Sequence, residues 1–87
     1  MPVIWIPALL RDLTDGQEKV EVPGTTLRQA LDELTTLYPE LRTRLVDEDR
    51  LRPDFSVIVD GTASYLKLRQ SLSENSEVHL VPAISGG

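Results

Sequence analysis

The first 24 positions contain two short stretches whose apolar residues suit β-strands. Residues 3–6 are apolar and mostly β-branched, with a tryptophan among them, which is typical of a strand. In residues 17–22, valines alternate with charged residues after Asp15-Gly16, a pair that favours a tight turn. This pattern predicts an N-terminal hairpin that ends at Pro23-Gly24. The leucine-rich residues 8–14 have no clear period, and no element is predicted for them.

An amphipathic helix is predicted to begin after Thr26. Thr26 and Gln29 have the spacing of a capping box, in which each side chain bonds the backbone N–H of the other residue. The apolar residues that follow recur every three or four positions: Leu27, Ala30, Leu31, Leu34, Leu37 and Tyr38. Pro39 disfavours the α conformation at the residue before it, so the helix is predicted to end there.

The second half of the chain alternates between short helical and extended patterns. Two leucines four positions apart predict a helical turn within residues 40–46, and the charged residues 47–50 are interpreted as a solvated loop. Residues 55–59 alternate as a strand that ends at the turn Asp60-Gly61. A short return strand is predicted at residues 65–68.

The last predicted strand covers residues 77–81. Val78 and Leu80 lie on one face by the period of two, and the alternate residues lie on the other. Pro82 is expected to end the strand, because proline cannot donate to a sheet ladder.

This order of elements predicts an α+β fold. One helix can cover one face of a sheet, and a crossover through that helix can place the last strand parallel to the first. We therefore predict a β-grasp, or ubiquitin-like, fold with a mixed four- to five-stranded sheet and one main helix packed on one face. The β-grasp domain is expected to cover residues 1–82, and residues 83–87 are expected to form a flexible tail.

The sheet face away from the helix is a candidate partner surface. If Ile4, Ile6, Val78 and Leu80 point inward, the alternate apolar residues point outward. That predicted surface consists of Trp5, Pro7, Ile58, Tyr65 and Val81. An apolar cluster on the open face of a small domain indicates a binding site. The alternative is that residues 8–14 or 39–54 fold over it.

Composition and charge narrow the classes of function. The 87 residues are 40% hydrophobic and 26% charged, which is ordinary for a folded domain. The net charge of −5 argues against a nucleic-acid partner. No apolar run is long enough to span a membrane, and the N-terminus does not resemble a signal peptide, so a cytoplasmic location is expected.

Catalytic and metal-binding patterns are missing from the sequence. Without cysteine there is no disulfide, no Cys-based zinc site and no catalytic thiol. His79 is the only histidine and has no evident partner, so we interpret it as a partly exposed strand residue rather than a catalyst. Residues 47–50 lack EF-hand spacing, and the chain contains no phosphate-binding glycine motif. No metal or cofactor is expected to bind, and the protein is not expected to be an enzyme.

The last six residues are the most specific signal in the chain. They are Pro82, Ala83, Ile84, Ser85, Gly86 and Gly87. A terminal glycine pair arises by chance in about 0.5% of chains. Because glycine has no Cβ, a partner's narrow channel could close around its backbone, and the Gly87 carboxylate is unreactive until it is activated. The alternative is that the glycine pair has no function and is only a frayed end or the boundary of the expressed segment.

With this tail, the chain resembles the MoaD/ThiS family of ubiquitin-like sulfur carriers over essentially its full length. The resemblance rests on Leu10-Arg11, Asp15-Gly16, Thr26-Leu27, Leu34, Tyr38-Pro39, residues 55–61, Glu77-Val78 and the tail. Two departures stand out: Ala83 replaces a second proline that is usual in molybdopterin-synthase small subunits, and Asn75-Ser76 replaces a common Gly-Asp. The Pro-Ala ending is more similar to carriers that supply cysteine biosynthesis.

The resemblance implies a chemistry centred on Gly87. An E1-like enzyme would adenylate its carboxylate with ATP, and a sulfur donor would displace AMP to leave a thiocarboxylate, with residues 82–86 threaded into the partner's site. The acceptor would be a molybdopterin synthase large subunit or a cysteine synthase, with thiamine synthesis less favoured. Two alternatives remain open: a ubiquitin-like modifier joined through Gly87 to lysines of target proteins, and a β-grasp interaction domain whose tail has no chemistry.

Overall fold

The computed structural model describes residues 1–82, so the predicted tail at residues 83–87 lies outside the described residues. The strands are β1 (Val3–Trp5), β2 (Lys19–Glu21), β3 (Val46–Asp47), β4 (Arg50–Leu51), β5 (Phe55–Val59), β6 (Thr62–Ala63) and β7 (Glu77–Pro82). The helices are α1 (Leu27–Leu37) and α2 (Leu41–Leu45), together with the 3-10 helices η1 (Ala8–Thr14) and η2 (Lys67–Arg69).

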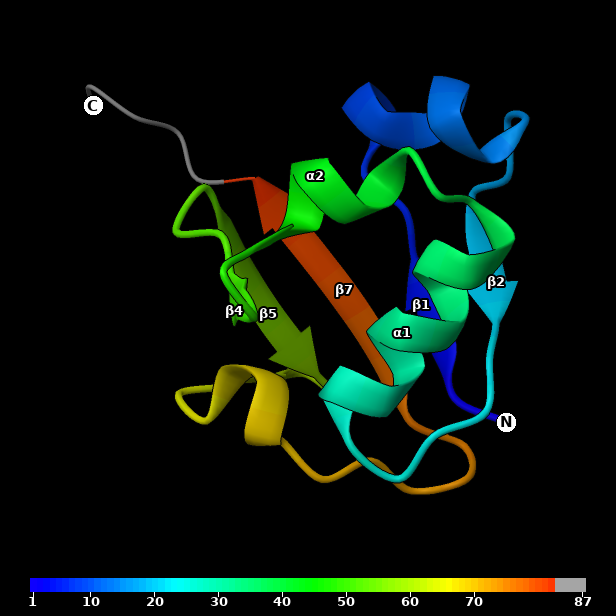
Figure 1. The fold of residues 1–87 in the computed structure, drawn as a ribbon. Coiled ribbons are helices and arrows are strands. Elements are labelled where there is room, and N and C mark those ends of the chain that lie inside the picture. The colour runs from blue at the N-terminus through cyan, green and yellow to red at the C-terminus, as the bar shows by residue number, and fades with distance from the viewer. Residues whose placement is uncertain (83–87) are drawn as a thin grey trace.

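Five of the strands form one mixed sheet in the order β2-β1-β7-β5-β6. β1 and β7 are parallel, and the other three pairs are antiparallel. β3 and β4 form a separate two-stranded hairpin. Figure 1 shows α1 and α2 in front of the same face of the sheet, so the predicted β-grasp arrangement with a parallel first and last strand is confirmed.

The core lies between α1 and the sheet. The four strand residues predicted to point inward, Ile4, Ile6, Val78 and Leu80, are at most 3% exposed. Opposite them, Leu27, Ala30, Leu31 and Leu34 of α1 are buried, and Leu41, Leu45 and Leu51 extend the same core. A continuous apolar layer of this kind is the main source of stability in so small a domain.

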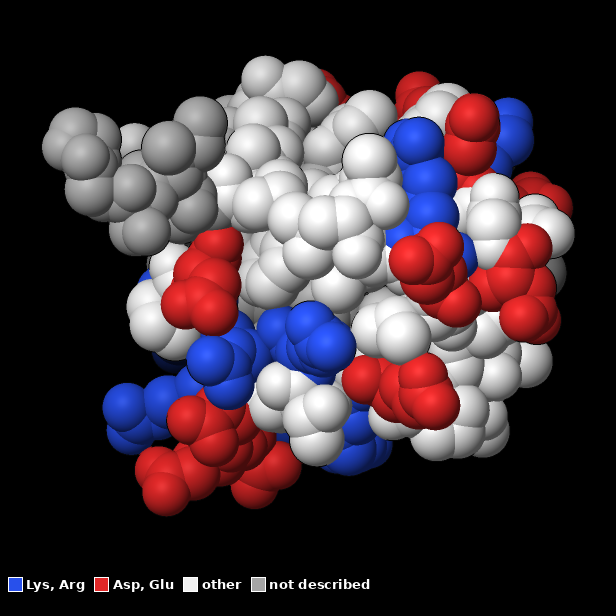
Figure 2. Space-filling view, turned by 90° about the horizontal axis from the view of Figure 1, so that it is seen from above, with Lys and Arg blue, Asp and Glu red and all other residues white. Residues whose placement is uncertain are grey.

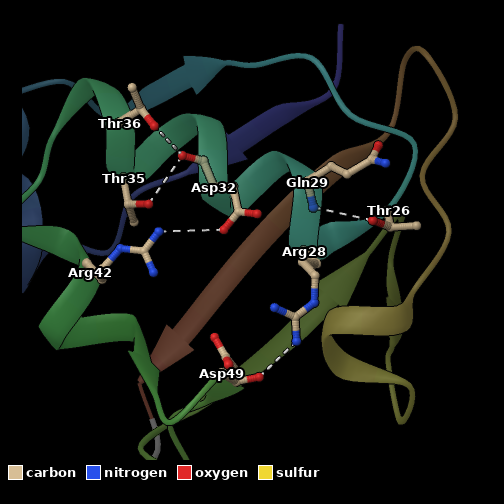
Figure 3. A network of polar contacts seen from close by, with 8 residues as sticks. All are labelled: Thr26, Arg28, Gln29, Asp32, Thr35, Thr36, Arg42 and Asp49. Carbon is tan, nitrogen blue, oxygen red and sulfur yellow. Dashed lines mark hydrogen bonds and ion pairs between the residues drawn. The ribbon is translucent and has the colours of Figure 1, made fainter.

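The predicted capping box at α1 is confirmed in one direction only. Thr26 Oγ1 accepts a hydrogen bond from the backbone N of Gln29 at 3.3 Å (Figure 3). The Gln29 side chain reaches one residue further back, where its Oε1 accepts from the backbone N of Thr25 at 2.8 Å and from its hydroxyl at 3.0 Å. Gln29 is therefore hydrogen-bonded to both Thr25 and Thr26, whereas a capping box would involve Thr26 alone.

The predicted apolar stripe of α1 is wrong at Leu37, which is 59% exposed. At about 100° per residue, Leu37 lies roughly 75° from the middle of the stripe, at its margin. The buried position on the other side of the stripe is occupied by Thr35, whose hydroxyl donates to the Asp32 carbonyl at 3.2 Å. α1 ends before Pro39, as predicted.

The predicted return strand at residues 65–68 is wrong. The return strand is β6, which begins directly after the two-residue turn Asp60-Gly61, where both residues have positive φ of 51° and 85°. Such a turn places the next residue opposite β5 at once. Residues 67–69 form η2 instead, and this turn places Leu68 beside α1, where its side chain is buried in the core.

Two other stretches are more regular than the sequence indicates. Residues 47–50 are exposed, as expected of a solvated loop, but they form the β3–β4 hairpin turn, with Glu48 and Asp49 at φ of 50° and 60°. β7 does not stop before Pro82, because Pro82 is paired with Phe55 at the start of β5. Pro82 has no backbone N–H to donate to the sheet, and this is tolerated because it is the last residue of its strand.

Candidate functional site

The sheet face away from α1 carries a row of side chains that crosses four strands. The register places Trp5 of β1 opposite Lys19 of β2 on one side and His79 of β7 on the other, and His79 opposite Ile58 of β5. Because side chains alternate between the two faces of a sheet, these four side chains lie on the face away from α1. We call this face, which is formed by the outward residues of β2, β1, β7 and β5, the open face.

Trp5 is fixed at the centre of the open face by three contacts. Its ring stacks on that of His79, with centroids 5.4 Å apart and planes 5° apart. Lys19 Nζ lies 5.3 Å from the ring centroid, within the range of a cation–π contact. Trp5 Nε1 also donates to Glu77 Oε1 at 3.0 Å. The open face is therefore an aromatic pair with charged groups around it, and not a simple apolar patch.

Three of the five residues predicted to form a partner surface lie on the open face: Trp5 and Ile58 are half-buried there, and Val81 is 39% exposed. Pro7 is half-buried between β1 and η1, and Tyr65 is 91% exposed in the bend after β6, so both lie outside the strands. The sequence analysis missed His79 as the stacking partner of Trp5. Only the parallel register of β1 and β7 makes that pairing visible.

Neither of the segments considered as possible covers lies over the open face within residues 1–82. η1 lies at one end of the sheet, where its Leu10 enters the core, and α2 lies on the side of α1 (Figure 1). Residues on the open face such as Ser56, His79 and Val81 are accordingly exposed. Among residues 1–82, no segment covers the open face.

β7 ends beside a groove of about 680 Å³ with both apolar and charged walls. The lining includes Leu9, Phe55 and Pro82 together with Arg44, Arg52 and Asp54. Arg52 Nη2 lies 3.3 Å from Asp54 Oδ2. Figure 2 looks down on this end of the molecule and shows uncharged residues across its middle, with charged side chains to the sides. Pro82, the last described residue, therefore lies at the groove, directly after Val81 of the open face.

The described residues contain no evident catalytic centre. Within residues 1–82, no group of three acidic or histidine side chains could hold a metal ion, and every buried side-chain nitrogen or oxygen has a hydrogen-bond partner. His79 contacts Trp5 rather than a nucleophile. No helix in this part of the chain has the length and apolar character needed to cross a bilayer.

Known proteins resemble this chain in sequence pattern and in fold. The ThiS family matches residues 4–87, whereas no curated protein matches the sequence. A chain of the crystal structure of the Amycolatopsis orientalis BexX/CysO complex is 26% identical with a TM-score of 0.92, and each chain is covered completely. Mycobacterium tuberculosis CysO is 25% identical with a TM-score of 0.87, covering 97% of this chain and 100% of that one. SAMP1 from Haloferax volcanii is 29% identical with a TM-score of 0.78, covering 99% and 98%.

The family match spans both the sheet just described and the residues that follow it. It covers β1 to β7 and extends to Gly87, and the similar solved structures have the same fold over nearly their whole length. The chain therefore belongs to the ThiS family of ubiquitin-like β-grasp sulfur carriers.

Proposed function

We propose that this protein transports sulfur as a thiocarboxylate on Gly87. An E1-like enzyme joins the Gly87 carboxylate to the α-phosphate of ATP, and pyrophosphate leaves. A hydrosulfide ion supplied by the donor then attacks the activated carbonyl carbon and forms the C–S bond, the bond to AMP breaks, and the thiocarboxylate remains. The observation on which this proposal rests is the family match, which includes the terminal glycine pair. The carrier supplies no catalytic group, and ATP binds to the partner enzyme.

We further propose that the open face docks the partner enzymes. Trp5 is large, amphipathic and held in one orientation by His79, Lys19 and Glu77, and such rigid aromatic residues are typical anchors of interfaces. Val81 lies one residue before Pro82, so a partner that contacts Val81 also controls where the tail starts. Residues 82–86 are then threaded toward the partner's reactive centre.

For the recipient we propose an acceptor enzyme of cysteine biosynthesis before one of molybdopterin synthesis. The Pro82-Ala83 ending supports this choice, as does the similarity to CysO structures from two organisms. A molybdopterin converting factor subunit from Pyrococcus furiosus has a lower TM-score of 0.67, and at 19% identity it is evidence for the fold alone.

The intact mass of the protein tests the carrier proposal. The chain is co-expressed with an E1-like enzyme of its host and a sulfur source, and its mass is measured. The expected result is a gain equal to the replacement of one oxygen by sulfur, located at Gly87 and lost when Gly87 is deleted. An unmodified mass, while the same enzyme thiocarboxylates a control carrier, would contradict the proposal.

A second function is protein modification through an isopeptide bond between Gly87 and lysines of other proteins. The similarity to the small archaeal modifier protein 1 of H. volcanii, at 26% identity, favours it. Lysine-linked adducts that contain the C-terminal peptide of this chain, found by mass spectrometry of cell extracts, would support the modifier function. Thiocarboxylate without such adducts would support the carrier function alone.

A further inference from the structure

A cleft of about 370 Å³ gathers four of the nine cationic side chains of the protein. Arg28 comes from the first turn of α1, Arg50 from β4, and Lys67 and Arg69 from η2. All four are exposed. Asp49 is the one carboxylate of the lining, so four cations face a single acidic residue in a chain that has fourteen of them and a net charge of −5.

The four cations have no carboxylate partner within the described residues. The two ion pairs found there, Arg42–Asp32 and Arg52–Asp54, use other arginines. Arg28 Nη2 donates instead to the backbone carbonyl of Asp49 at 2.9 Å, which fixes the guanidinium between α1 and the β3–β4 turn (Figure 3). With four cations and the single carboxylate of Asp49 in its lining, the cleft keeps an excess of positive charge that an anionic ligand would neutralise.

Apolar side chains accompany these charges. Leu66 lines the cleft and is 50% exposed, and Leu51 forms part of its buried floor. The neighbouring Lys67 has φ of 52°, a left-handed conformation that residues with a side chain rarely adopt. Strain of this kind persists where the surrounding structure fixes it, and it recurs at ligand-binding sites.

We propose that this cleft docks an acidic peptide segment of a partner protein, in which an apolar side chain lies among several carboxylates. The carboxylates would contact the four cations, and the apolar side chain would pack on Leu66. A nucleic acid fits less well, because its continuous phosphate backbone would extend past the cleft onto Asp47 and Glu48, which are exposed on the adjoining β3–β4 turn, whereas a short peptide need not reach them. The proposal does not depend on sulfur transfer.

The position of the cleft separates it from the tail. η2 lies near the end of the sheet at which β7 begins, whereas Pro82 lies at the other end (Figure 1). The six residues of β7 span about 17 Å, at roughly 3.3 Å per residue. A partner bound at the cleft therefore leaves both the open face and the tail accessible to a second protein.

Titration of the ¹⁵N-labelled full chain with a synthetic peptide tests this proposal. The peptide has two leucines, each flanked by pairs of glutamates, and a peptide with glutamine in place of glutamate is the negative control. We expect the acidic peptide to shift the amide signals of residues 28, 50, 66, 67 and 69. The double substitution Lys67→Gln with Arg69→Gln should weaken binding about tenfold, the scale of two charge-assisted contacts.

The matched control is Arg42→Gln with Arg44→Gln, which removes the same charge from α2 and should change the affinity by less than about twofold. Arg50→Gln provides a second test if the first double variant does not fold. Equal weakening by both double variants, shifts at other residues, or no binding would overturn the proposal, as would tighter binding of an eight-residue uridine oligonucleotide at the same amides. Deleting residues 86–87 should leave peptide binding unchanged while it abolishes thiocarboxylation.

Discussion

Replacing Val81 with aspartate separates docking from folding. Val81 is 39% exposed and points away from the core residues Val78 and Leu80, which share its strand. Its loss should cost about 1 kcal/mol of unfolding free energy, the full span of β-propensity in a host sheet. Trp5 is a less suitable site: its stack, cation–π contact and hydrogen bond are together worth about 1.5–4 kcal/mol, a large part of the stability of a small domain.

The effect of Val81→Asp on partner binding should be much larger. A carboxylate buried without a partner in an interface costs at least about 2.7 kcal/mol, or roughly a hundredfold in affinity. Calorimetric titration with the E1-like enzyme measures this loss, and urea unfolding measures the stability. The matched control is Leu37→Asp, which makes the same kind of change at an exposed apolar residue of α1. A folded Val81→Asp variant that binds as tightly as the unchanged protein would refute docking through the open face.

Four substitutions test the structural basis of the fold by urea unfolding. Thr26→Ala removes the helix cap and should cost about 1 kcal/mol; no change would mean that the contact to Gln29 is not the effective cap. Gly24→Ala should cost about 2–3 kcal/mol, because its Cβ would lie 2.8 Å from the Ala30 backbone nitrogen, whereas Gly61→Ala, with free space around it, should cost about 1 kcal/mol. Equal costs at the two glycines would contradict the close approach. Ser76→Ala should cost about 1–2 kcal/mol, since the buried hydroxyl bonds Asp60 and the backbone nitrogen of Ser73; a neutral result would show that water replaces it.

Strand patterns were predictable where one face is buried. The strands at residues 55–59 and 77–81 alternate because every second residue enters the core, whereas residues 3–6 were predicted from an apolar, mostly β-branched run; the structure confirms each strand within a residue or two. Residues 65–68 alternate in the same way without forming a strand. There the alternation arises from one core contact, that of Leu68, and from the exposure of its neighbour Leu66.

The geometry of the site was less predictable than its location. The alternation of side chains along each strand is enough to place Trp5, Ile58 and Val81 on the face opposite the core. The stack of Trp5 on His79 depends in addition on the register between β1 and β7, which lie far apart in the chain: Trp5 and its hydrogen-bond partner Glu77 are separated by 72 residues. No local pattern contains that register. It follows from packing the crossover helix, and from the total length of the segments between the two strands.

β7 connects three parts of the molecule on which the proposed function depends: the core, the open face and Pro82, after which the tail begins. It is hydrogen-bonded on both edges, to β1 and to β5, and its residues point alternately into the core and onto the open face. A partner that binds the open face therefore fixes the position and direction of Pro82. Five residues separate Pro82 from the end of the sequence, and they can span at most about 17 Å. Under the proposed function, the adenylating centre of the partner must lie within that distance of Pro82, so a docking geometry set by β7 would control how well the reacting groups are positioned.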